Sequence, residues 1–248
     1  MSQTILVIAG GQAPAADVVA ELPVPDYCIA ADSGADHASI MGRVPDLVIG
    51  DMDSVSPFAL AWAARGGAVV ERYPAAKDAS DLELALDAAL ERLTETAGTV
   101  ESSADSSDAH GVGEIYVVSI DGVRADHVLA NILLLAHPKY AEAVVHGVVG
   151  SGRFMVVHGG TKRSIGGDSG TLVSLLPVHG EVTGVVTSGL AYPLHGESLT
   201  PGSSRGVSNT MDGTQAVVSV ESGTLVVVQP FAYDSHERSS EPGLGPNQ

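Results

Sequence analysis

The stretch Leu47-Val48-Ile49-Gly50-Asp51-Met52-Asp53-Ser54 puts two carboxylates directly after a short apolar run. A short apolar run bounded by turn residues predicts a buried strand. The run at 27–31 has the same character and is followed by Asp32. Because the carboxyl ends of parallel strands meet at one edge of an open α/β sheet, where ligands bind, we expect these carboxylates to converge. Taken alone, Asp51 and Asp53 would be better explained by an Asx turn than by a ligand site.

A third acidic cluster, Lys77-Asp78-Ala79-Ser80-Asp81, lies between a predicted strand at 68–72 and a predicted helix at 80–93. Ser80 fits an S-x-x-E capping box and Asp81 suits a first helical turn, so both have a structural explanation. Capping explains neither Lys77 nor Asp78, and a cation just before a helix N-terminus favours bound anions. Mg²⁺ typically takes one or two carboxylates together with substrate phosphates, so the clusters predict metal-assisted chemistry on a phosphate ester.

Strands and helices alternate through the first half of the chain, which predicts an α/β fold with a doubly wound parallel sheet. The predicted strands are 4–9, 27–31, 47–49, 68–72 and 114–120, and the predicted helices are 15–22, 35–41, 56–65, 80–93 and 125–137. Residues 96–113 are rich in Ser, Gly and acidic residues, which predicts a flexible insert.

From residue 142 onward the pattern changes to strand-like runs separated by turns, which predicts an antiparallel sandwich or barrel. These runs are 143–149, 153–158, 170–178, 181–188, 215–220 and 224–229. We therefore expect a first domain over 1–148, an all-β domain over 149–233 and a disordered tail over 234–248.

The composition excludes several functional classes. The chain has 248 residues and a formal net charge of −18, which argues against nucleic-acid binding. The charge is uneven, with 22 acidic against 7 basic residues through Val145 and 8 against 5 after it. Cys28, the single cysteine, lies in an apolar run, which predicts a core residue and fits a reducing cytoplasm. No apolar run reaches the roughly 20 residues of a membrane span, and the N-terminus lacks the features of a signal peptide.

The segment Asp121-Gly122-Val123-Arg124-Ala125-Asp126-His127 follows a predicted strand and opens a predicted helix. Gly122 allows the backbone to approach a ligand closely, and Arg124 can bind a phosphate through two nitrogens. Asp126 is explained as an acid in a first helical turn, and His127 as either a base or a structural residue.

Taken together, these motifs resemble the thiamine pyrophosphokinase family. The resemblance is carried by 31–35, 50–54, 77–81 and 124–131 in the first half, and by 174–177, 189–194 and 206–209 in the second half. It covers most of the chain outside 96–113 and the tail. Ser33 and Val123 depart from it, because both stand where the family usually has glycine.

The resemblance implies a Rossmann-like α/β domain and a C-terminal β-sandwich, assembled as a homodimer with active sites between subunits. It implies transfer of pyrophosphate from ATP to the hydroxyl of thiamine, with Mg²⁺ required. The metal and phosphates would be held by Asp51, Asp53 and Asp81, with Lys77 and Asp78 beside them as further catalytic residues and Asp78 as the candidate base. The ATP-binding residues would be Asp32, Gly34, Ser54, Gly122, Arg124 and Asp126. The thiamine-binding residues would be Tyr192, Ser208 and Asn209.

Two alternatives remain open at this point. A non-catalytic thiamine or nucleotide sensor would use the same scaffold and would bind without forming AMP. A metal-dependent phosphohydrolase would use water as the acceptor and would not need thiamine. Each acidic residue could also be a cap, a turn or a solvated side chain, but this does not explain why the clusters occur together.

Overall fold

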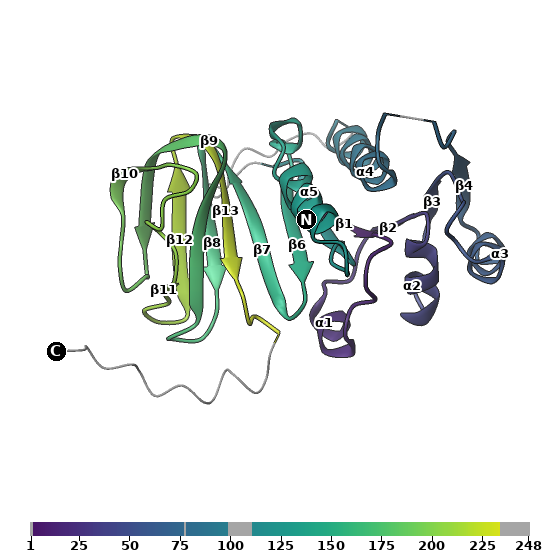
Figure 1. Ribbon diagram of the computed structural model, residues 1–248, viewed down its shortest axis with the longest axis horizontal. Coiled ribbons are helices and arrows are strands. Elements are labelled where there is room, and N and C mark those ends of the chain that lie inside the picture. The colour runs from purple at the N-terminus through teal and green to yellow at the C-terminus, as the bar shows by residue number, and fades with distance from the viewer. Residues whose placement is uncertain (1, 77, 99–110, 234–248) are drawn as a thin grey trace. The chain divides into compact units, whose positions relative to one another are not determined.

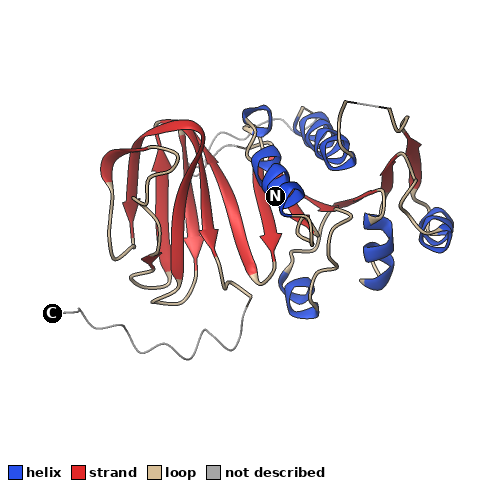
Figure 2. Cartoon of the chain, viewed as in Figure 1, coloured by secondary structure: helices blue, strands red, loops and turns tan. Residues whose placement is uncertain are grey.

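The computed structural model describes residues 2–76, 78–98 and 111–233 (Figure 1). Lys77, most of the expected insert and the expected tail therefore lie outside the described residues. The chain divides into two compact units between Gly150 and Ser151. Helices occur in the first unit, whereas the second is built from strands (Figure 2).

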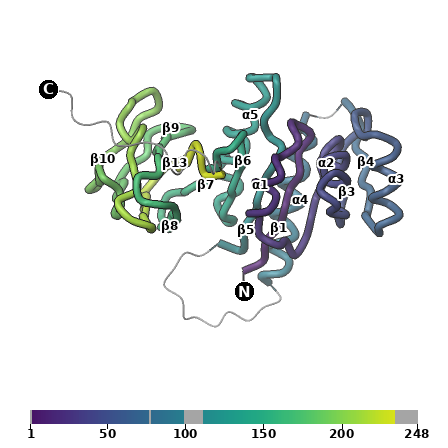
Figure 3. The backbone as a smooth tube through the Cα atoms, turned by 90° about the horizontal axis from the view of Figure 1, so that it is seen from below, coloured from purple at the N-terminus to yellow at the C-terminus, as the bar shows by residue number. Residues whose placement is uncertain are grey.

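The first unit contains a sheet of six parallel strands. They are β1 (Gln3–Ile8), β2 (Tyr27–Ala31), β3 (Leu47–Gly50), β4 (Val69–Arg72), β5 (Gly113–Val118) and β6 (Val144–Val149). Their spatial order is β4-β3-β2-β1-β5-β6, with every neighbouring pair parallel. Figure 3 shows β4 and β6 at opposite ends of this unit. The run at 143–149 follows the change of pattern at residue 142 but falls almost entirely within the predicted first domain, and it forms the sixth parallel strand, paired with β5.

Five α-helices accompany this sheet. They are α1 (Ala16–Glu21), α2 (Gly34–Ile40), α3 (Pro57–Arg65), α4 (Asp81–Ala97) and α5 (Ala125–Leu135), with a short 3₁₀ helix at Pro138–Tyr140. Figure 1 shows α1 and α2 on one face of the sheet and α4 and α5 on the other. Because both faces are covered, β1 is buried continuously, with Ile5, Leu6, Val7 and Ile8 at most 1% exposed.

Among the five α-helices of the described residues, α3 and α4 begin with a side-chain cap, whereas α1, α2 and α5 have none. The hydroxyl of Ser56 accepts a hydrogen bond from Ala59 N at the start of α3. Ser80 caps α4 by accepting from Glu83 N at 3.2 Å. The Glu83 carboxylate accepts a hydrogen bond from Lys139 Nζ at 2.7 Å and so interacts with another part of the chain. Helix α4 also continues four residues beyond the predicted end, to Ala97, and so takes up the start of the expected insert.

The second unit consists of antiparallel ladders around one apolar core. Its strands are β7 (Gly152–His158), β8 (Thr161–Gly166), β9 (Leu172–Ser188), β10 (His195–Leu199), β11 (Asn209–Thr210), β12 (Gln215–Val220) and β13 (Ser222–Gln229). Strand β13 pairs with β7 and β9, and β12 pairs with β8 and β9. Both ends of β9 contribute to the core, through Val173 and Leu175 at one end and Val182 and Val185 at the other.

Strand β9 replaces two strands expected at 170–178 and 181–188. The backbone turns within it at His179 and Gly180, where φ is 60° and 135°. Such irregularities bend a strand without ending it. In β9, residues 174–178 and Thr183 pair with β13, and residues 186–188 pair with β12. Strands β8, β10 and β11 are not among the strands predicted from the sequence. In β8 the buried Arg163 interrupts the apolar alternation that would have indicated a strand.

Across residues 2–76, 78–98 and 111–233, the helices are all too short or too polar to cross a membrane. Cys28 is 3% exposed, and burial raises the pKa of its thiol to about 12. This confirms the prediction that Cys28 is a core residue, since a thiol with this pKa is a poor nucleophile at neutral pH.

Candidate active site

Three carboxylates converge at the carboxyl ends of β2 and β3. Asp32 follows β2, and Asp51 and Asp53 follow β3. The backbone N–H of Asp32 donates to Ile49 O at 2.9 Å, which holds the ends of the two strands side by side. One carboxylate oxygen from each of the three aspartates lies within 4.8 Å of the others. This spacing fits a shared divalent cation.

Asp81 borders this group from the first position of α4. A Cβ built on Gly50 would lie 2.9 Å from Asp81 Oδ1 and 3.1 Å from Asp32 Cβ, so all three residues meet at one point. The expected metal set was Asp51, Asp53 and Asp81, whereas the set within 4.8 Å contains Asp32 in place of Asp81. The reason is strand order, because β2 and β3 are direct neighbours while Asp81 begins a helix.

The environment of Asp32 suits a cation. Asp32 is 5% exposed, and its Oδ1 has no hydrogen-bond partner within the part of the chain that the structure describes. Burial raises the pKa of Asp32 above its ordinary value; a hydrogen bond from Ser33 N lowers it, while Asp81, Asp51 and Asp53 raise it further. A buried carboxylate near other carboxylates is costly unless a positive charge compensates it. The residues therefore fit a bound Mg²⁺.

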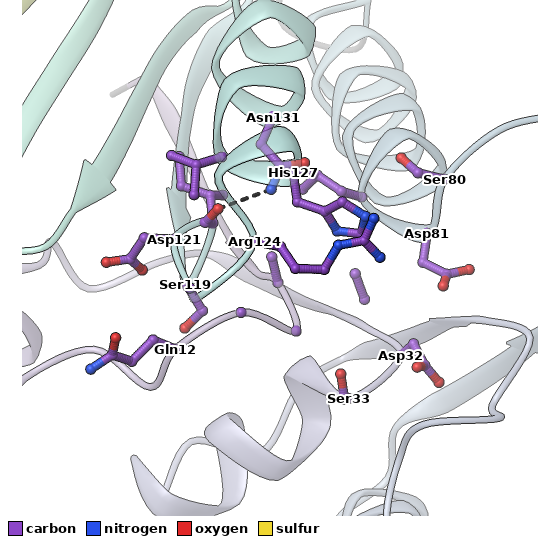
Figure 4. A pocket seen from close by; sticks show the side chains of 18 of the residues that line it. Gln12, Asp32, Ser33, Ser80, Asp81, Ser119, Asp121, Arg124, His127 and Asn131 are labelled. Carbon is purple, nitrogen blue, oxygen red and sulfur yellow. Dashed lines mark hydrogen bonds between the residues drawn. The ribbon is translucent and has the colours of Figure 1, made fainter.

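A pocket of about 620 Å³ opens beside these carboxylates (Figure 4). Its walls come from the loops after β1 and β5 and from the starts of α4 and α5. In Figure 4, Asp32 and Asp81 lie at one end of the pocket and Gln12, Ser119 and Asp121 at the other. The lining residues are Ala9, Gly10, Gly11, Gln12, Ala31, Asp32, Ser33, Ser80, Asp81, Leu82, Ser119, Ile120, Asp121, Gly122, Val123, Arg124, His127, Val128 and Asn131.

The loop after β1 packs closely against the loop after β5, and the backbone amides of Gly11 and Gln12 donate hydrogen bonds to it. Gly11 N donates to Ser119 O at 2.8 Å, and Gln12 N donates to Asp121 O at 2.7 Å. A Cβ on Gly11 would lie 2.1 Å from Asp121 O, so only glycine fits between the two loops. His37 Nε2 lies 2.8 Å from Gly11 O and holds the other side of the loop. These amides are therefore engaged with the β5 loop and are not free for a phosphate.

The positive charge of the pocket comes from the start of α5. The Arg124 guanidinium forms two hydrogen bonds to Asp126, at 2.6 and 3.3 Å, which raise the pKa of Arg124 and lower that of Asp126. Figure 4 shows the side chains of Arg124 and His127 extending toward Asp81. Asn131 Nδ2 donates to Ile120 O at 2.9 Å and ties α5 to the loop before it. The pocket thus combines buried carboxylates with an exposed guanidinium.

Six of the predicted catalytic and ATP-binding residues that the structure describes do not line this pocket: Asp51 and Asp53 of the three-aspartate group beside it, and Gly34, Ser54, Asp78 and Asp126. A Cβ on Gly34 would lie 2.0 Å from Ile8 O, so this glycine permits α2 to pack on β1. The Ser54 hydroxyl donates to Asp53 Oδ1 at 2.7 Å. Asp126 is paired with Arg124. Asp78 is exposed in the turn before α4. Lys77 lies outside the described residues.

Ser33 and Val123, the two departures from the family pattern, both line the pocket. The Ser33 hydroxyl occupies space beside Gly10, because a Cβ on Gly10 would lie 2.2 Å from it. Val123 is fully exposed at the rim. Neither side chain disturbs the three-aspartate group.

A second pocket, of about 410 Å³, lies within the second unit and contains all three predicted thiamine residues. It is lined by Tyr192, Leu194, Ser203, Ser204, Arg205, Gly206, Val207, Ser208 and Asn209. Tyr192 is 68% exposed. Arg205 pairs with Glu197 at 2.9 Å, which places a compensated charge beside the pocket.

Asn209 shapes this pocket through its buried side-chain amide. Its Oδ1 accepts from Tyr192 N at 3.0 Å and from Thr210 N at 2.9 Å, and its Nδ2 donates to Tyr192 O at 2.7 Å. Asn209 therefore fixes the backbone of Tyr192. Ser208 has a φ of 57°, and its N–H donates to Ser174 Oγ at 3.0 Å.

Some pocket residues were not predicted from the sequence, among them Gly10, Gly11, Gln12 and Ser119. The Gly10-Gly11 pair at the end of the apolar run at 4–9 could have indicated a loop that approaches a ligand. Ser119 lies inside a predicted strand and carried no such signal.

The fold and the first pocket define an α/β protein that binds its ligand at the carboxyl edge of a parallel sheet, beside a carboxylate group suited to a divalent cation. Residues 22–145 match the model of the "Thiamin pyrophosphokinase, catalytic domain" family, and residues 162–225 match that of the "Thiamin pyrophosphokinase, vitamin B1 binding domain". The chain belongs to the thiamin pyrophosphokinase family.

Individual relatives agree with this assignment. The chain is 24% identical to the thiamine pyrophosphokinase of Bacillus subtilis (strain 168) over 228 residues, which cover 92% of this chain and 98% of that protein. A crystal structure of thiamine pyrophosphokinase from Bacillus subtilis matches with a TM-score of 0.73 at 25% identity, covering 92% of this chain and 98% of that one. The enzyme from Candida albicans shares the fold, with a TM-score of 0.71 at 17% identity over 91% of this chain and 89% of its own. Family membership supports thiamine diphosphokinase as the activity of the chain.

Proposed function

We propose that the chain transfers the pyrophosphoryl group of ATP to thiamine through the residues of the first pocket. The observation that carries this assignment of residues is the group formed by Asp32, Asp51 and Asp53 at the mouth of a pocket that also contains Arg124. In the reaction, the thiamine hydroxyl oxygen forms a bond to the β-phosphorus of ATP. The bond from that phosphorus to the α–β bridging oxygen breaks, and AMP leaves.

Mg²⁺ would be held by Asp32, Asp51 and Asp53, with Asp81 beside them. When bound, the ion supplies charge neutralisation to the phosphates, which is the main requirement of phosphoryl-type transfer. The buried and unpartnered Oδ1 of Asp32 supports this placement. Lys77 and Arg124 would add positive charge around the phosphates, and Asp78, which is exposed before α4, is our candidate to accept the proton of the thiamine hydroxyl.

ATP would occupy the first pocket. Arg124 can turn from Asp126 to a phosphate, because both side chains are well exposed and an exposed ion pair is worth little. Gly122 would let the loop after β5 approach the nucleotide. Three further predicted residues would act without lining the pocket. Gly34 would allow α2 to pack on β1, and Ser54 would orient the Asp53 carboxylate. Asp126 would hold Arg124 when no phosphate is bound.

Thiamine would bind in the second pocket, against Tyr192 and Ser208. The exposed aromatic face of Tyr192 suits the cationic thiazolium ring through a cation–π contact. Asn209 would hold Tyr192 in place and offer its remaining amide hydrogen to the ligand. We propose a homodimer in which the thiamine pocket of one subunit completes the nucleotide pocket of the other, as the family resemblance implies.

The domain assignment belongs to the same proposal. Residues 1–148 would form a Rossmann-like, doubly wound nucleotide domain, and 149–233 a β-sandwich that binds thiamine. The parallel order of β1–β6 and the paired ladders around β9 support these assignments. We also propose a cytoplasmic location, which a buried, reduced Cys28 supports.

The test is AMP release from ATP and Mg²⁺ with and without thiamine, together with quantification of thiamine diphosphate. We expect AMP only with thiamine, in equal amount to thiamine diphosphate. AMP or phosphate release without thiamine would support a phosphohydrolase. Binding of thiamine and ATP with no AMP would support a sensor.

A further inference from the structure

Backbone strain is concentrated at the two pockets. Among the residues that the structure describes, five other than glycine have positive φ: Asp32, Met52, Ser119, His179 and Ser208. Asp32 and Ser119 line the first pocket, and Met52 lies between Asp51 and Asp53. A non-glycine residue with positive φ is uncommon, and such residues persist mainly where function requires them.

Asp32 and Ser119 also share a second property. The Oδ1 of Asp32 and the Oγ of Ser119 are both buried, and neither oxygen has a hydrogen-bond partner in residues 2–76, 78–98 or 111–233. Their residues are 5% and 2% exposed. Buried polar atoms are nearly always hydrogen-bonded in folded proteins, so two exceptions in one pocket indicate atoms that await a ligand. The carboxylates around Asp32 explain the first exception, but nothing in the proposed function explains Ser119.

We propose that the Ser119 hydroxyl is a ligand-contacting group of the nucleotide pocket and binds the nucleoside end of ATP. This inference rests on the proposed binding of ATP in the first pocket. In Figure 4, Ser119 lies with Gln12 and Asp121 at the end of the pocket opposite Asp32 and Asp81. Since the carboxylates mark the end for metal and phosphates, Ser119 faces the sugar or the base.

The chemistry of the side chain fits that ligand. A hydroxyl both donates and accepts hydrogen bonds, as the ribose hydroxyls and the polar edge of the base require. Rotation about the Cα–Cβ bond moves Oγ between staggered positions, so the hydroxyl can turn from its buried position toward the pocket. The backbone of Ser119 is held meanwhile, because its carbonyl accepts from Gly11 N at 2.8 Å.

The test compares Ser119→Gly and Ser119→Ala by calorimetric titration with ATP and with AMP, each with Mg²⁺ and without thiamine. Both variants lose the hydroxyl, and we expect both to bind ATP about 3- to 10-fold more weakly, the effect of one hydrogen bond. AMP affinity should fall by the same factor, because AMP retains the nucleoside end. Ser39→Ala, whose hydroxyl donates to Asp36 O outside the pocket lining, should bind both nucleotides like the wild type.

Thermal denaturation separates this role from a structural one. Glycine adopts a φ of 60° without strain, so Ser119→Gly should melt above Ser119→Ala and about 2–4 °C above the wild type. Weaker nucleotide binding in a more stable variant cannot come from unfolding.

Wild-type affinity for ATP in both variants would overturn the inference, as would an effect on ATP without an effect on AMP. A wild-type chain that binds ATP but makes no thiamine diphosphate would overturn the proposed function alone.

Discussion

The two pockets of this chain differ in how their polar groups are satisfied. In the second pocket, Asn209 makes three hydrogen bonds to neighbouring backbone, and Arg205 is paired with Glu197. In the first pocket, the oxygens of Asp32 and Ser119 are buried with no hydrogen-bond partner among the described residues. The second pocket is therefore formed before its ligand arrives. In our proposals, an ion is the missing partner of Asp32 and a nucleotide that of Ser119, and both residues also have the positive φ that is common at functional sites.

The strongest test of this difference is Asp51→Asn. Removing one charge from the carboxylate group should lower turnover by at least about 100-fold, because the cation loses a charged ligand. The melting temperature without Mg²⁺ should stay nearly unchanged, since an asparagine oxygen can still accept from Asp53 N. Steady-state AMP release and a melting curve in chelator measure the two effects. Asp212→Asn, an exposed change in the second unit, is the control, and wild-type turnover in Asp51→Asn would refute the metal assignment.

In the second pocket the corresponding change should affect stability first. Asn209→Ala removes three partly buried hydrogen bonds and should cost about 2–3 kcal/mol of unfolding free energy. Thiamine affinity should fall as well, because Tyr192 loses its anchor, while ATP affinity stays unchanged. Denaturant unfolding and titration with each ligand measure these effects.

Asn209→Asp provides the matched control for this change. It keeps the acceptor for Tyr192 N and Thr210 N but loses the donor to Tyr192 O, so its stability should fall between the wild type and the alanine variant. Equal stability of all three proteins would show that this network does not hold the pocket.

A smaller effect is expected at the exposed ring of the second pocket. Tyr192→Ala should raise the thiamine KM about 3- to 30-fold through loss of the cation–π contact, with little change in melting temperature because the side chain is exposed. Tyr192→Phe keeps the aromatic face and should retain the wild-type KM. If alanine and phenylalanine give the same KM, the ring does not bind the thiazolium.

The smallest effect concerns the pH dependence of stability in the first pocket. The pKa of Asp32 is raised in the folded state, mainly by burial, so folding binds its proton more tightly than the unfolded chain does. This contribution to stability is complete below the ordinary aspartate pKa and is lost as pH rises through the raised folded value. In the presence of a chelator, the melting temperature of Asp32→Asn minus that of the wild type should therefore increase as the pH rises from about 4 toward neutrality.

Mg²⁺ should reverse this trend. At neutral pH the ion should raise the melting temperature of the wild type and have less effect on Asp32→Asn, which offers a weaker ligand. Melting curves at several pH values, with chelator and with Mg²⁺, measure both parts. A larger Mg²⁺ effect on the variant would contradict the role of Asp32 as a ligand.

Particular residues show how far the sequence could lead. The cap at Ser80, the buried Cys28 and the acidic residues after β2 and β3 are local features that the sequence predicts, and the structure contains each of them. The convergence of Asp32 with Asp51 and Asp53 follows from the strand-end pattern of the sequence. Whether Asp81 lies within 4.8 Å of them depends on where α4 begins in space, which a local pattern does not encode. The continuous course of β9 through His179 and Gly180 was hidden because a left-handed backbone resembles a turn in sequence.

The sequence by itself determined where apolar runs, caps and carboxylates fall along the chain, because periodicity and capping involve residues only a few positions apart. It also carried the motifs that identify the family. Only the tertiary structure decided that β6 joins the parallel sheet, that the amides of Gly11 and Gln12 are used by the β5 loop, and that Asn209 holds Tyr192. The physical reason is that strand order and long-range hydrogen bonds join residues far apart in sequence, and local patterns do not encode which of them will meet.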